Sequence, residues 1–158
     1  MVRTQRTQRG SVVDFFRGFE EQLNKQLAAQ NKLKHKHLKV RVVFVPVSRD
    51  ELLPALAEGR GDVVAANLTI TPERQQLVDF TEAGMRNISE VLVSGPSSPA
   101  VSSLDDLSGK QVFVRKSSSY YQSLVALNQR LTAAAKAPVE IKEAPEVLED
   151  EDLLEMLN

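Results

Sequence analysis

Apolar positions change their spacing along the chain, and each spacing predicts a different element. Over 11–27 they recur three or four residues apart, which predicts an amphipathic helix with its phenylalanines in a core. Residues 39–47 (KVRVVFVPV) and 62–67 (DVVAAN) are dense in β-branched residues, as is typical of strands buried on both faces. The leucine-rich stretch between them predicts a helix opened by a Ser48–Glu51 capping box.

The order strand, helix, strand predicts a βαβ unit, which requires a parallel sheet. A further strand is expected over 88–95. The proline- and serine-rich segment 96–103 (PSSPAVSS) interrupts the pattern, and we place a hinge there. Lobe 1 is then expected to span 1–95 and lobe 2 to span 104–158.

The second lobe repeats the alternation of strands and helices. After a capped turn, 111–115 (QVFVR) predicts a strand, 117–137 a helix opened by serines, and 139–145 another strand. The acidic end, LEDEDLLEMLN, predicts the start of a helix, where acids are favoured. The fold class expected is therefore α/β, with one βαβ parallel-sheet lobe and an incomplete second α/β lobe.

Composition narrows the possible functions only slightly. The 158 residues are 42% hydrophobic and 26% charged, which is ordinary for a soluble globular protein. A net charge of −1 gives no general reason to expect a nucleic-acid partner, and the basic run 32–41 lacks interleaved aromatics. The chain has no cysteine, so disulfides and thiolate metal sites are excluded. Neither a membrane-spanning run nor a signal peptide is present in the sequence.

Two junctions carry the most suggestive chemistry. In the sequence AANLTITPER (65–74), Thr71 and Pro72 predict a helix start, which places Arg74 in the first turn, where a cation is unfavourable. Asn67 and Thr69 supply hydrogen-bonding groups beside it, and a guanidinium suits a carboxylate.

The second junction is RKSSSYY (115–121), a serine-rich helix start whose backbone amides favour an anion. Its candidate residues are Ser117, Ser118, Ser119 and Tyr120. Ligands of open parallel sheets bind beyond the carboxyl ends of strands, so the two junctions are expected to grip a small carboxylate together.

A structural interpretation has equal weight at this point. Thr71 and Ser117 are ordinary helix caps, and Arg74 is able to pair with Glu73, Asp79 or Glu82. The remaining candidates are weaker. His35 and His37 have no third metal ligand near them in sequence, and no histidine is placed to activate the serines as nucleophiles. We therefore expect no metal, no cofactor and no catalysis by this chain.

The stretch GDVVAANLTITPERQQLVDFT resembles type II periplasmic solute-binding proteins of the amino-acid type. The likeness continues through ELLPALAEGRGD, ISEVLVSG, SLDDLSGK and QVFVRKSSSYY. The same segment is also similar to the substrate-binding-like regulatory domain of membrane-bound lytic transglycosylases of the F type.

The resemblance implies two α/β lobes that close over a ligand. It assigns the ligand carboxylate to Arg74, first-lobe hydrogen bonds to Asn67 and Thr69, and the second-lobe helix start to Ser118 and Ser119. It implies a non-catalytic solute-binding or sensor module for an amino acid or a peptidoglycan-derived peptide. The alternatives are a regulatory domain of a lytic transglycosylase and a scaffold domain that has lost binding.

Further expectations follow from the same resemblance. The family's first strand and the later part of its second lobe are missing from the sequence, so the chain is expected to be truncated at both ends. The partners implied are an ABC-transporter-like membrane permease or a fused glycan-cleaving domain, in the periplasm or at the outer membrane. Open sheet edges also predict domain exchange or a dimer.

Overall fold

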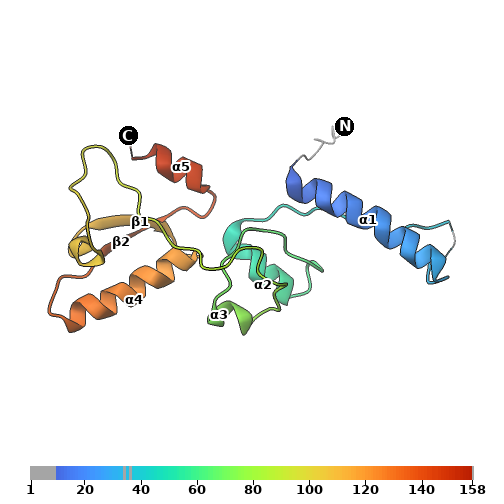
Figure 1. Ribbon diagram of the computed structural model, residues 1–158, viewed down its shortest axis with the longest axis horizontal. Helices are drawn as coiled ribbons and strands as arrows, with labels where there is room; N and C mark the ends of the chain where they lie inside the picture. The colour runs from blue at the N-terminus through green and yellow to red at the C-terminus, as the bar shows by residue number, and fades with distance from the viewer. Residues whose placement is uncertain (1–9, 34, 36, 158) are drawn as a thin grey trace. The chain divides into compact units, whose positions relative to one another are not determined.

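The computed structural model describes residues 10–33, 35 and 37–157 (Figure 1). The chain divides into two compact units, 1–46 and 47–158. No helix among the described residues is both long enough and apolar enough to cross a membrane. The expected lobe boundary at 96–103 stays a prediction.

The first unit consists of one long helix and the segment that follows it. Helix α1 spans Ser11–Ala29, close to the expected 11–27. Its buried Asn24 accepts a hydrogen bond from the Val40 N–H at 2.8 Å and donates to the Val40 carbonyl at 2.9 Å. Glu20 accepts from the Val42 N–H at 2.7 Å. Helix side chains therefore satisfy backbone groups that a neighbouring strand would otherwise satisfy.

The phenylalanines of α1 are not in a core, so that expectation was wrong. Phe15 is 68% exposed and Phe19 is 47% exposed. Phe16 is half-buried and meets Phe44 edge-on, with ring centroids 6.3 Å apart.

The second unit holds the remaining elements (Figure 1). In chain order these are a 3-10 turn (Arg49–Glu51), α2 (Leu52–Ala57), α3 (Pro72–Gln75), a 3-10 turn (Leu104–Leu107), β1 (Gln111–Arg115), α4 (Ser119–Ala133), β2 (Glu140–Ala144) and α5 (Asp150–Glu155). Ser48 precedes the first turn, but its side chain makes no capping hydrogen bond. The expected capping box is therefore not formed, and Glu51 instead lies 3.9 Å from Arg60.

The second half of this unit matches the sequence expectation closely. Strands β1 and β2 pair in parallel, with Val112 opposite Ile141, and α4 connects them. The core lies under α4 and contains the buried side chains of Leu107, Leu127, Leu131 and Val139. Leu131 is the most deeply buried, at 1% exposure. In this βαβ arrangement the start of α4 lies close to the carboxyl end of β1, where the Ser118 hydroxyl donates to the Arg115 carbonyl.

Three expected strands, 39–47, 62–67 and 88–95, are not formed in the structure. The βαβ unit expected in the first lobe is therefore wrong for this structure. Val43, Val63 and Val91 show the reason, because they are 78%, 65% and 81% exposed and no strand among the described residues pairs with them. β-branched residues favour a strand only where cross-strand neighbours and burial are available.

Candidate functional site

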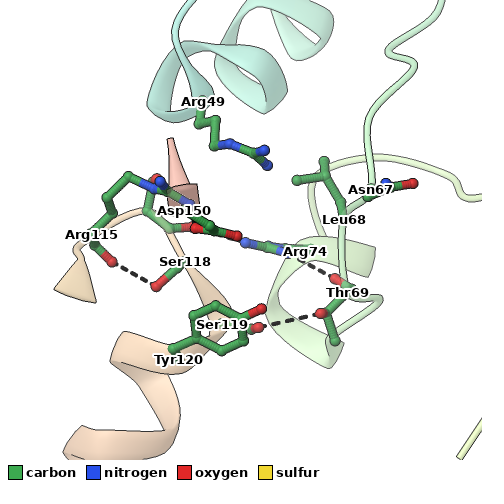
Figure 2. Close-up of a pocket in the computed structure, with 11 residues that line it drawn as sticks. Arg49, Asn67, Leu68, Thr69, Arg74, Arg115, Ser118, Ser119, Tyr120 and Asp150 are labelled. Carbon is green, nitrogen blue, oxygen red and sulfur yellow. Dashed lines mark hydrogen bonds and ion pairs between the residues drawn. The ribbon is translucent and has the colours of Figure 1, made fainter. Parts of the chain in front are cut away.

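A polar pocket lies in the second unit, where the starts of α3, α4 and α5 converge (Figure 2). Its lining includes every candidate residue from the sequence: Asn67, Thr69, Arg74, Ser117, Ser118, Ser119 and Tyr120. It also includes Arg49, Leu68, Arg115 and Asp150. The cavity volume is about 60 Å³, well below the roughly 300–1,000 Å³ of typical small-ligand sites.

Arg74 is held in the pocket by the short helix α3. The Thr71 hydroxyl caps this helix and accepts from the Arg74 N–H at 3.4 Å, and Pro72 occupies the first helical position, as predicted. The guanidinium donates to the Thr69 carbonyl from Nη1 and to the Ser117 carbonyl from Nη2, both at 2.8 Å. Only 8% of the residue is exposed, so the side chain is fixed rather than free in solvent.

Arg74 has no acidic partner within the part of the chain that the structure describes. Glu73, Asp79 and Glu82, the alternatives open from sequence, form no ion pair with it. Desolvation by burial lowers the pKa of Arg74 below its ordinary value. Two carbonyl oxygens hold the cation but do not neutralise it, so the site favours an anion.

The start of α4 forms the facing wall. The Ser118 hydroxyl accepts from the Tyr121 N–H at 3.3 Å and donates to the Arg115 carbonyl at 2.7 Å, which makes it the helix cap. The Ser119 hydroxyl lies 3.3 Å from the Thr69 hydroxyl, so the two junctions expected from sequence meet directly (Figure 2). Tyr120 is 45% exposed and lines the pocket rather than the core.

Ser117 is already engaged by a residue that sequence reasoning missed. Its N–H donates to Glu146 at 2.9 Å and its hydroxyl donates to the same carboxylate at 2.5 Å. The carbonyl of Ser117 remains the acceptor for Arg74. Glu146 therefore orients the peptide that holds the arginine. No sequence signal links Glu146 to Ser117, because the contact depends on how the chain returns after β2.

Three charged lining residues were also missed. Arg49 donates to Glu149 from Nε at 3.0 Å and from Nη2 at 2.8 Å. Arg115 is 4% exposed, donates to the Leu148 carbonyl at 2.5 Å and pairs with Asp150. Arg115 was detectable, since it ends a strand on the edge where ligands bind. The EDED run was interpreted only as the first turn of a helix.

The histidines lie in the first unit. The rings of His35 and His37 are 5.8 Å apart between centroids. No group of three or more histidine, aspartate or glutamate residues with metal-binding geometry occurs in the described ranges 10–33, 35 and 37–157.

Comparisons with known proteins identify the family to which the sequence is similar. A family model described as bacterial extracellular solute-binding proteins, family 3, matches residues 4–155. The chain is 33% identical over 110 residues to the membrane-bound lytic murein transglycosylase F of Desulfosudis oleivorans. It is also 33% identical over 107 residues to the L-cystine-binding protein TcyJ of Escherichia coli. No solved structure matches the chain at a significant level.

These matches confirm the two resemblances inferred from GDVVAANLTITPERQQLVDFT, to the solute-binding family and to the transglycosylases of the F type. The alignment with the transglycosylase covers 70% of this chain and 22% of the relative. The alignment with the cystine-binding protein covers 68% of this chain and 38% of the relative. The chain therefore spans well under half the length of the curated relatives that it matches.

Proposed function

Because the chain belongs to the bacterial extracellular solute-binding proteins of family 3, we propose that it is a non-catalytic binding or sensor module. Its ligand is the carboxylate of an amino acid or of a peptidoglycan-derived peptide. The output is closure of two lobes around that ligand. The family model implies a type II periplasmic-binding-protein fold, and the small parallel sheet of the second unit is consistent with it.

One observation carries this proposal. Arg74 is buried in a polar pocket, and among the described residues its guanidinium donates only to carbonyl oxygens and has no acidic partner. A buried charge without a counterion is costly, and a ligand carboxylate would supply that counterion. In this proposal Asn67 and Thr69 hydrogen-bond the ligand from one side, and Ser118, Ser119 and Tyr120 line the other.

Closure is supported by contacts that cross the expected hinge. The Arg74 guanidinium reaches the Ser117 carbonyl, and the Thr69 hydroxyl reaches Ser119. Both contacts join residues before 96–103 to residues after it. A ligand that binds to both sides favours the closed arrangement by its difference in affinity for the two states.

A second candidate function follows from the relatives. Membrane-bound lytic murein transglycosylases F occur among the matches in Desulfosudis oleivorans and, at 35% identity over 89 residues, in Maricaulis maris. In this version the module regulates a glycan-cleaving domain on the same polypeptide, at the periplasmic face of the outer membrane. The other version pairs it with a membrane permease. A lysozyme-like domain encoded in the same reading frame would support the regulatory role over the permease partnership.

The proposal is tested by calorimetric titration of the chain with free amino acids and with a muropeptide. Arg74→Ala removes the anchoring cation, and we expect at least about a tenfold loss of affinity, since hydrogen bonds to charged groups contribute about 1.5–3 kcal/mol. The matched control is Arg86→Ala, because Arg86 is exposed and lies outside the pocket lining.

The control should bind as the unaltered chain does. Equal affinities of the unaltered chain and Arg74→Ala would reject Arg74 as the anchor. Absence of heat with every probe would reject ligand binding itself and favour a scaffold role.

A further inference from the structure

We infer that the ligand of this pocket carries two anionic groups, one bound by Arg74 and the second by Arg49. This inference rests on the proposed function and names the chemical class of its ligand. The class is a dicarboxylate, such as an acidic amino acid or a peptide with an acidic side chain. It predicts that neutral and cationic amino acids bind more weakly.

The charged residues that line the pocket favour an anionic ligand. Three guanidinium groups line the pocket, those of Arg49, Arg74 and Arg115, whereas Asp150 is the sole carboxylate in the described lining. Asp150 already pairs with the buried Arg115. A ligand ammonium group therefore meets no free acid in the described lining, whereas two further cations face it.

Acidic residues near the pocket lining do not neutralise its excess of positive charge. Glu146 is held by the N–H and hydroxyl of Ser117. Glu149 binds Arg49, but its side chain is 57% exposed and lies outside the lining. Only the Arg49 end of this ion pair lines the pocket.

The geometry of Arg49 leaves room for a second acceptor. Its Nε and Nη2 both donate to a single oxygen, Oε2 of Glu149, at 3.0 and 2.8 Å. A guanidinium has five N–H donors in a planar fork, and no described residue accepts a hydrogen bond from Nη1 of Arg49. Arg49 can therefore bind an incoming anion while it stays paired with Glu149.

Arg49 and Arg74 reach the pocket from different elements. Figure 2 shows the Arg49 guanidinium extending toward the pocket from the 3-10 turn Arg49–Glu51, while Arg74 enters from the side of Thr69. Nε of Arg115, buried in the same wall, has no hydrogen-bond partner among the described residues. The wall therefore has more donors than acceptors, which an anionic ligand would correct.

The test uses L-glutamate and L-glutamine, which differ in charge at one group and have nearly the same shape. Calorimetric titration of the full chain should give glutamate a roughly two- to fivefold advantage, the upper range for an exposed ion pair. Arg49→Gln should abolish this advantage and leave glutamine binding nearly unchanged. Circular dichroism confirms that the variant is folded.

Glu149→Gln is the matched control, because it breaks the same ion pair but keeps the Arg49 charge. It should preserve or increase the preference for glutamate. Equal binding of the two probes by the unaltered chain would overturn this inference and leave the proposed function standing. Equal loss of the preference in both variants would also overturn it, since the ion pair rather than the free cation would then be responsible. Failure of both probes to bind would overturn the proposed function and this inference together.

Discussion

Arg74 keeps a charge in an environment that disfavours it. The residue is 8% exposed, and its burial lowers the pKa of the guanidinium. Two carbonyl oxygens offset part of the desolvation, since hydrogen bonds to charged groups are stronger than neutral ones. The position of Arg74 was predictable from Thr71 and Pro72, because helix capping is a local rule. Its anchoring by the Ser117 carbonyl was not predictable, since that contact spans 43 positions.

Asn128 holds α4 against the start of β2. Its side-chain oxygen accepts from the Val139 N–H at 2.6 Å, and its amide nitrogen donates to the Val139 carbonyl at 3.0 Å. Val139 is 3% exposed, so water cannot replace either bond. Asn24 has the same relation to Val40 in the first unit. In both units one amide side chain satisfies a backbone donor and a backbone acceptor.

Asn128→Ala should therefore destabilise the second unit by about 1–3 kcal/mol, the usual cost of unsatisfied buried polar groups. Urea unfolding monitored by circular dichroism measures this difference. The neighbouring Gln129→Ala is the control, because Gln129 is exposed, and we expect it to change stability by less than about 0.5 kcal/mol. Equal effects of the two substitutions would show that the Val139 bonds contribute nothing specific.

At the scale of elements, sequence patterns succeeded where each element finds its partner nearby. Strand β1 was predicted at its observed bounds, Gln111–Arg115, because β2 returns beside it after one helix. The β-branched segments 39–47 and 62–67 have equally strong patterns, but neither pairs with a strand among the described residues, and most of their residues are exposed. The local pattern indicates which residues favour a strand. Whether the strand forms depends on a pairing partner elsewhere in the chain, which the local pattern does not reveal.

The 3-10 turn Leu104–Leu107 is stabilised by a charged cap. One oxygen of Asp106 accepts from the Ser102 N–H at 2.9 Å and from the Ser103 N–H at 2.8 Å. These hydrogen bonds, that of Ser102 foremost, hold the pKa of Asp106 below its ordinary value. A lowered folded-state pKa means that this contribution to stability is complete above the ordinary pKa and is lost as pH falls through the folded-state pKa.

Asp106→Asn should lower the melting temperature at pH 7, and the difference from the unaltered chain should shrink below about pH 3.9, the ordinary aspartate pKa. Thermal melts between pH 2 and 7 measure this dependence. Asp62→Asn serves as the comparison, because Asp62 is exposed and outside any described hydrogen bond or ion pair. A constant difference at every pH would contradict a role for the Asp106 charge.

At the scale of the whole molecule, the candidate pocket belongs entirely to the second unit. Every lining residue falls within 47–158, although the lining segments are spread over a hundred positions of the chain. Helix-capping residues in the sequence predicted the two junctions that line this pocket, 65–74 with Arg74 and 115–121 with its serines. It did not identify Arg49, Glu146 or Asp150, because their role arises from long-range contacts.

The central claim is that Arg74 binds the α-carboxylate of the ligand. The most direct measurement is a calorimetric cycle with L-glutamate and L-isoglutamine, which differ only at that carboxylate, against the unaltered chain and Arg74→Ala. We predict a coupling free energy of at least about 1.5 kcal/mol between the carboxylate and Arg74, as for a hydrogen bond to a charged group. A coupling near zero, with the two probes affected equally by the substitution, would contradict the account.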